Sequence, residues 1–83
     1  MQAKHNDTIT DRARTKLAKL TRVSVDTIQT KVDAPTPGNA GQHVCIDCGE
    51  LPANNMMASS HERENPTHRI AWRCFDNGRI EAP

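Results

Sequence analysis

Apolar side chains recur at helical spacing near the N-terminus of the chain. The spacing predicts a helix over 11–21 that begins after Thr8 or Thr10, because their hydroxyls can cap a helix N-terminus. One face of this helix carries Ile9, Ala13, Leu17 and Leu20. Ser24 is another capping residue and predicts a second helix that ends near Asp33.

Near the C-terminus the pattern changes to alternation, which is typical of a strand. Over 69–76 the alternation puts Ile70, Trp72 and Cys74 on one face. Asn-Gly at 77–78 is a strong hairpin signal, so residues 79–81 are expected to return as an antiparallel strand. The fold class expected is therefore α+β, with two N-terminal helices and a small β-hairpin unit.

Two further segments divide the chain. Residues 34–42 contain two prolines and two glycines and are typical of a linker. This predicts a helical part over 1–33, the linker over 34–42 and a β unit over 43–83. Within the β unit, the segment 52–65 is ambiguous: it leaves open a short helix that starts near residues 56–58 and must end before Pro66.

Composition adds a shortage of core residues and an uneven charge. The 83 residues include one Trp, one Phe and no Tyr, so a metal ion would help to stabilise so small a core. The formal net charge is +1, but the basic excess belongs to residues 1–33. The sequence has no signal peptide and no long apolar run, so we expect a cytoplasmic protein with no membrane partner.

The strongest chemical motif is Cys45-Ile46-Asp47-Cys48-Gly49. Two thiolates at this spacing can hold one tetrahedral zinc ion, and the glycine permits a tight turn. Cys74 begins a similar motif that lacks its second cysteine. We therefore expect one structural zinc ion on Cys45, Cys48, Cys74 and a histidine. His68 is the first choice for the fourth ligand, with His61 and His43 as alternatives.

These cysteine motifs resemble a zinc ribbon in which Asn77 replaces the fourth cysteine. The segment Cys-Ile-Asp-Cys-Gly-Glu-Leu-Pro, with Asp11-Arg12-Ala13 near the chain start, also resembles the TraR/DksA-type transcription factors. That resemblance implies one long N-terminal helix with an acidic tip at Asp7 and Asp11. It also implies RNA polymerase as the partner.

Residues 14–33 resemble the helix-turn-helix of MerR-type and LacI-type regulators. Ala18 stands where the two helices cross, Ser24 caps the second helix and Ile28 locks it in place. The resemblance implies binding to double-stranded DNA, with the second helix in the major groove. The residues implied to contact bases are Val25, Asp26, Gln29 and Thr30, and those implied to contact phosphates are Arg12, Arg14, Lys16, Lys19, Arg22 and Lys31.

Together these features predict a small, non-enzymatic transcription regulator that binds DNA and contains a structural zinc ion. One alternative is a factor that binds RNA polymerase. The other is an inhibitor or adaptor that binds another protein through its zinc unit. A regulator this short is typical of phages and plasmids. The sequence leaves the oligomeric state open.

Overall fold

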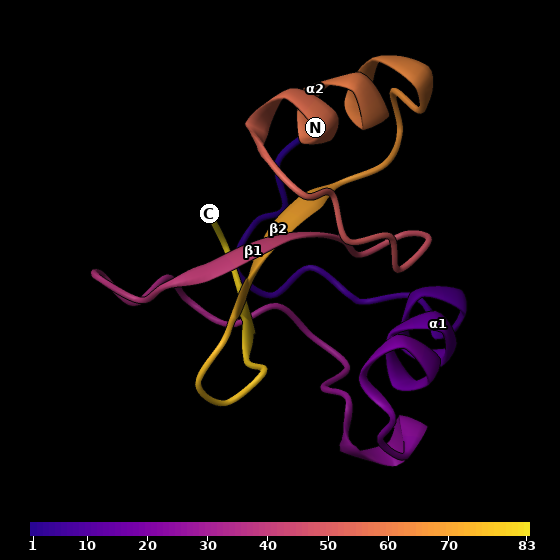
Figure 1. Cartoon of the computed structure of the whole chain (residues 1–83), viewed down its shortest axis with the longest axis vertical. Helices are drawn as coiled ribbons and strands as arrows, with labels where there is room; N and C mark the ends of the chain where they lie inside the picture. The colour runs from indigo at the N-terminus through magenta and orange to yellow at the C-terminus, as the bar shows by residue number, and fades with distance from the viewer.

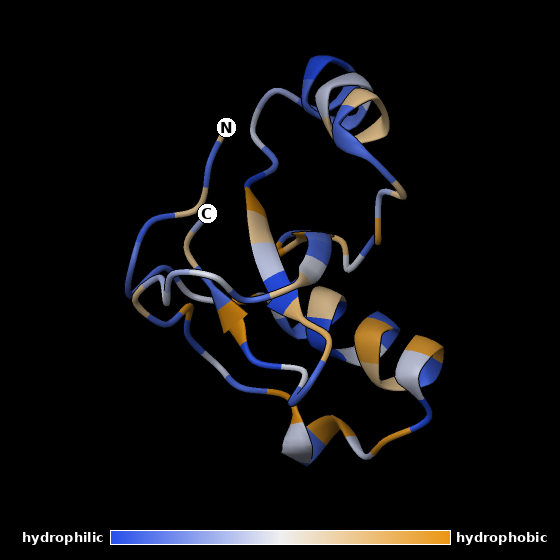
Figure 2. Ribbon diagram, turned by 60° about the vertical axis from the view of Figure 1, so that its left-hand side comes forward, coloured by the Kyte–Doolittle hydropathy of each residue, from blue (hydrophilic) through white to orange (hydrophobic).

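A three-stranded antiparallel sheet lies between two helices in the computed structural model, which describes residues 1–83 (Figure 1). The strands are β1 (Gly41–Cys45), β2 (Ile70–Cys74) and β3 (Ile80–Glu81), in the order β1-β2-β3. The helices are α1 (Asp11–Thr21) and α2 (Asn55–Glu64), and the sheet separates them in Figures 1 and 2. The chain is thus a small α+β protein, as the sequence predicts.

The first helix, α1, has the predicted bounds. The Thr10 side chain caps it by accepting a hydrogen bond from the Ala13 N–H, and Arg22 ends it in a left-handed conformation with φ of 57°. Ala13 and Leu17 are buried as expected. Leu20 is 53% exposed, contrary to the pattern, and is not part of the core cluster.

The predicted second helix is wrong. The chain does turn at Arg22, and Ser24 does cap a helical segment, but that segment is a single 3₁₀ turn, η1 (Val25–Thr27). Beyond it the backbone is extended, and Asp33 forms a bridge with Glu81 beside β3. β-Branched residues such as Val32 favour this extended path, which also buries Val32 in the core. The single long helix implied by the TraR/DksA resemblance is not formed either.

One hydrophobic core joins the two ends of the chain. It is built by Ala3, Ile9, Ala13, Leu17, Val32, Val44, Ile46, Ala71 and Ile80. Residues from 1–33 and from 43–83 therefore share a core on the side of the sheet that faces α1. Figure 2 shows hydrophobic residues on α1 and a mostly hydrophilic α2, of which only Ala58 is buried.

The other face of the sheet carries a row of side chains with different chemistry. Strand register pairs Cys45 with Ile70, His43 with Trp72 and Gly41 with Cys74, and it pairs Trp72 with Glu81. The predicted hairpin after β2 is confirmed. The segment 52–65, which the sequence leaves ambiguous, forms the short helix α2, and this helix ends at Glu64, before Pro66. Neither α1 nor α2 has the length and apolar character needed to cross a lipid bilayer.

Candidate metal centre

The motif at 45–49 forms a tight turn at the end of β1. The Cys45 N–H donates to the Glu50 carbonyl and the Gly49 N–H donates to the Cys45 carbonyl, each at 2.8 Å. Gly49 has φ of 82°, a conformation that residues with a side chain rarely adopt. Both Cys45 and Cys48 are buried, and the turn brings their thiols to the same side.

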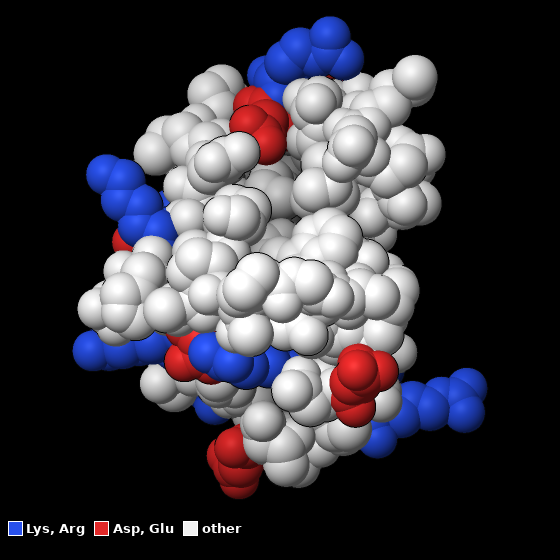
Figure 3. Space-filling view, turned by 90° about the vertical axis from the view of Figure 1, so that its left-hand side faces the viewer, with Lys and Arg blue, Asp and Glu red and all other residues white.

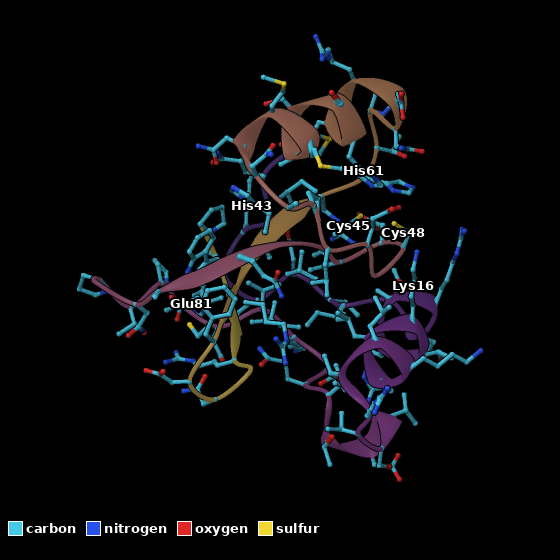
Figure 4. The ribbon with its side chains drawn as sticks, in the orientation of Figure 1. Lys16, His43, Cys45, Cys48, His61 and Glu81 are labelled. Carbon is cyan, nitrogen blue, oxygen red and sulfur yellow. The ribbon has the colours of Figure 1, made fainter.

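The end of α2 and the turn after it supply two imidazoles. His61 is in the last turn of α2, and the Asn65 N–H caps that turn by donating to the His61 carbonyl at 2.9 Å. The His68 N–H then donates to the Asn65 carbonyl at 2.9 Å, which turns the chain back toward β2. Both side chains consequently point toward the cysteine turn, as the labelled His61 does in Figure 4.

Cys45, Cys48, His61 and His68 each contribute one atom to a group whose members all lie within 4.8 Å of one another. The distances are 3.4 Å from Cys45 Sγ to His68 Nδ1, 3.6 Å from Cys48 Sγ to His61 Nε2, and 3.2 Å from His61 Nε2 to His68 Nδ1. A tetrahedral zinc ion, with Zn–S bonds of about 2.3 Å and Zn–N bonds of about 2.0–2.1 Å, separates its ligand atoms by about 3.3–3.8 Å. The spacing of these four atoms is therefore suited to one tetrahedral cation.

Two opposing effects act on the Cys45 thiol. Burial raises the pKa of the Cys45 thiol to about 11, although backbone N–H groups of Asp47 and Cys48 donate to the sulfur and oppose this rise. Those N–H groups stabilise a thiolate once it forms. A bound cation reverses the effect of burial, because a coordinating thiol loses its proton outright.

Charged groups outside the four-residue group hold its parts in place. The Asp47 carboxylate, within the turn, accepts from the Arg69 N–H at 2.7 Å and from the Arg69 guanidinium at 2.9 Å. Burial opposes ionisation of Asp47, but these Arg69 contacts keep its pKa below the usual value. On the other side, His61 Nδ1 lies 3.9 Å from a Glu50 carboxylate oxygen. This carboxylate is too distant to accept a hydrogen bond from His61, but its negative charge lies next to the group.

Three of the expected ligands, Cys45, Cys48 and His68, are in the group. Cys74 is not, which corrects the expected set. Its partner across the sheet is Gly41, four residues before Cys45. At about 3.3 Å per residue, Cys74 is about 13 Å along the strand from Cys45.

His43 is also outside the group. Its Nε2 lies 2.6 Å from Asn55 Oδ1, and its ring packs against Trp72. His61 is the ligand that the sequence-based ranking placed second. The signal that could have found it is the short helix that the sequence leaves open over 52–65, because the end of that helix brings His61 back to the turn while β2 carries Cys74 away.

The residues expected to contact DNA differ in exposure: two are engaged within the chain and the others are exposed. Gln29 is engaged internally, since its amide nitrogen donates to the Lys31 carbonyl at 2.7 Å and its oxygen accepts from the Ile80 N–H at 2.8 Å. Arg14 donates to the Ile28 carbonyl at 2.9 Å and is largely buried. The remaining expected contacts are exposed: Arg12, Lys16, Lys19, Arg22, Val25, Asp26, Thr30 and Lys31.

Comparison of the chain with protein-family models, with curated proteins and with solved structures gives no match. The site is therefore interpreted from its own geometry.

Proposed function

We propose that this chain is a small zinc-binding protein whose ion is held by Cys45, Cys48, His61 and His68. The observation that carries the proposal is the convergence of two thiols and two imidazoles at tetrahedral spacing. Hydrogen bonds between pairs of these side chains would not bring all four to one point, whereas coordination of a single ion would. Thiolate and neutral imidazole together are a preferred ligand set for zinc.

The zinc ion in this proposal is structural, and the protein is not an enzyme. Four protein ligands fill a tetrahedral ion and leave no open position for water or substrate. The ligands come from the end of β1, from α2 and from the segment before β2. One ion thus ties the mostly hydrophilic α2 to the sheet, where few apolar contacts hold it. Binding free energy at such a site adds to folding free energy.

Metal analysis tests this proposal through matched variants. We expect about one equivalent of zinc per chain in protein purified without chelators. Cys45→Ser and His61→Ala should each lower zinc affinity by at least about 100-fold, because each removes a direct ligand. Cys74→Ser and His43→Ala are the controls, since they remove the same side-chain types outside the group. Both controls should retain one equivalent.

Two results would contradict the proposal. One is zinc content well below one equivalent in the folded wild-type protein. The other is loss of zinc from Cys74→Ser together with its retention in His61→Ala, which would restore the ligand set expected from sequence.

A second proposal concerns the partner, for which double-stranded DNA remains the candidate. Its support is the exposed side of α1, where Arg12, Lys16 and Lys19 recur at helical spacing and Arg22 follows. Lys16 also forms an ion pair of 4.0 Å with Glu50 beside the metal centre, and its side chain remains 45% exposed. Such a row suits phosphate contacts. Base reading through Gln29 is not part of this proposal, because its amide is bonded within the chain.

Salt dependence and charge reversal test DNA binding. Affinity for duplex DNA should fall steeply as salt rises, because each phosphate contact releases counterions. Lys16→Glu with Lys19→Glu should weaken binding at least about tenfold, whereas Lys4→Glu, on the N-terminal segment, should change it little. Equal affinity in both variants would exclude α1 as the DNA-binding surface.

A further inference from the structure

A second candidate site lies at the opposite end of the sheet from the metal centre. It is a hollow of about 500 Å³ whose walls include Pro35, Pro37 and Pro83, with Trp72 and Glu81 from the sheet. Figure 4 places Glu81 well away from Cys45 and Cys48. Figure 3 views the molecule from the side on which residues 37–41 protrude in Figure 1, and much of the middle of this face is free of charged atoms.

Glu81 is the unusual member of this wall. Its side chain is 3% exposed, and its Oε2 atom accepts no hydrogen bond. The nearest cation is the Arg79 guanidinium, whose Nη1 is 3.9 Å away and too distant to donate. Arg79 instead donates to Asp33 at 2.9 Å and to Thr36 at 3.0 Å. A buried carboxylate oxygen without a donor is costly, and a donor from a ligand would satisfy it.

Trp72 provides an aromatic surface next to this carboxylate. It pairs with Glu81 across the sheet, so both side chains are on the same face. The indole N–H donates to the Asn39 carbonyl at 3.2 Å, which fixes the ring against the proline-containing segment. The indole is the aromatic system that attracts cations most strongly.

The charge of the hollow points to a positively charged ligand. Glu81 is the only ionisable side chain among the residues that line it, and no lysine, arginine or histidine is present. A compact ammonium group can donate to one buried carboxylate oxygen, whereas a guanidinium pairs best with both oxygens at once. We propose that the hollow bounded by Trp72, Glu81 and the three prolines binds an alkylammonium group, such as the end of a lysine side chain.

This proposal is independent of zinc, because none of the four metal-binding residues lines the hollow. Trp72 is the only tryptophan, so its fluorescence and its indole N–H resonance report directly on binding. The probe is N-acetyl-lysine amide, titrated into the zinc-loaded wild-type protein. N-acetyl-norleucine amide, which has the same kind of alkyl chain without the ammonium group, is the uncharged control, and N-acetyl-arginine amide tests the guanidinium.

We expect saturable binding of the lysine probe, and binding at least about tenfold weaker for the norleucine probe. The arginine probe should fall between them. Equal affinity of the lysine and norleucine probes would overturn the proposal. So would a failure of the lysine probe to shift the Trp72 signals at concentrations up to about 100 mM, well beyond the millimolar affinities expected of small charged fragments.

A substitution then tests whether the charge of Glu81 causes the preference for the lysine probe. Glu81→Gln keeps the shape of the side chain and removes its charge, so it should abolish the preference for lysine over norleucine. Glu64→Gln, an exposed carboxylate on α2, is the matched control and should keep that preference. A preference retained in Glu81→Gln would overturn the proposal. If that variant does not fold, the comparison of probes in the wild-type protein decides alone.

Discussion

At the scale of residues, Cys45 and Cys74 show how position determines the role of a thiol. Both are buried on the same face of the sheet. Cys45 receives backbone N–H groups and faces the other three side chains of the candidate metal centre. Burial raises the pKa of Cys74, and the nearby Glu81 carboxylate raises it further. Cys74 is therefore kept as a neutral thiol, which neither binds metal well nor reacts readily.

Cys74 should react slowly with thiol reagents. In the zinc-loaded protein at about pH 7.5, we expect none of the three thiols to react rapidly. The rate of Cys74 modification should follow the rate of unfolding, because the thiol is 2% exposed and its thiolate is disfavoured. Stopped-flow measurement with a disulfide reagent checks this. In the Cys45→Ala/Cys48→Ala variant, Cys74 is the only thiol, and circular dichroism shows whether the variant is folded. Rapid modification of Cys74 in the folded variant would contradict its burial.

At the scale of elements, the cysteine turn and α1 are packed closely enough to depend on each other. The Thr10 hydroxyl, which caps α1, also donates to the Asp47 carbonyl at 2.9 Å. A Cβ atom at Gly49 would be 2.7 Å from the Ala13 carbonyl oxygen and 2.8 Å from the Lys16 Cβ atom. The glycine is thus required both by its positive φ and by the approach of α1.

Two glycine substitutions separate these two causes. Gly38 and Gly49 share φ of 82°, but nothing lies within 4 Å of a Cβ atom at Gly38. Gly38→Ala should therefore lower the free energy of unfolding by about 1 kcal/mol, from backbone strain alone. Gly49→Ala should lower it by about 3 kcal/mol, since steric overlap is added. Urea denaturation at fixed zinc concentration measures both. Equal losses would show that α1 does not press on the turn.

The elements differ in how far the sequence could predict them. Local signals suffice for α1, because Thr10 caps it and its apolar spacing matches its buried face. They suffice for the hairpin between β2 and β3 as well, although β2 ends at Cys74 and the loop is longer than the Asn-Gly pair. They fail over 24–33, where the capping signal at Ser24 is genuine but only one turn forms. Pairing of the extended chain with β3 and burial of Val32 decide that segment, and both depend on residues far along the sequence.

At the scale of the whole molecule, one core connects the parts that the sequence divides. Ile9 and Leu17 pack in the same cluster as Val44 and Ile80. The metal site shows the same dependence on distant residues. The register of β1 with β2 separates Cys74 from Cys45, and the end of α2 supplies His61 in its place. Residue type and local spacing predict three of the four proposed ligands, but the choice between His61 and Cys74 requires the sheet register.

Without zinc, the chain should therefore be less stable and should still unfold in a single urea transition. In excess chelator, the helical signal of α1 in far-ultraviolet circular dichroism and the fluorescence of Trp72 should be lost at the same urea concentration. The shared core is the reason, since α1 has no other apolar surface to pack on. Loss of the Trp72 signal with retained helicity would instead indicate two units that fold separately.

In the proposed site, two thiolates and two imidazoles hold one zinc ion. X-ray absorption at the zinc edge of the purified protein tests it most directly, because it counts sulfur and nitrogen neighbours separately. The account predicts two sulfur atoms at about 2.3 Å and two imidazole nitrogens at about 2.0–2.1 Å. The same spectrum is expected from Cys74→Ser. Three sulfur neighbours in the wild-type protein, falling to two in Cys74→Ser, would contradict it.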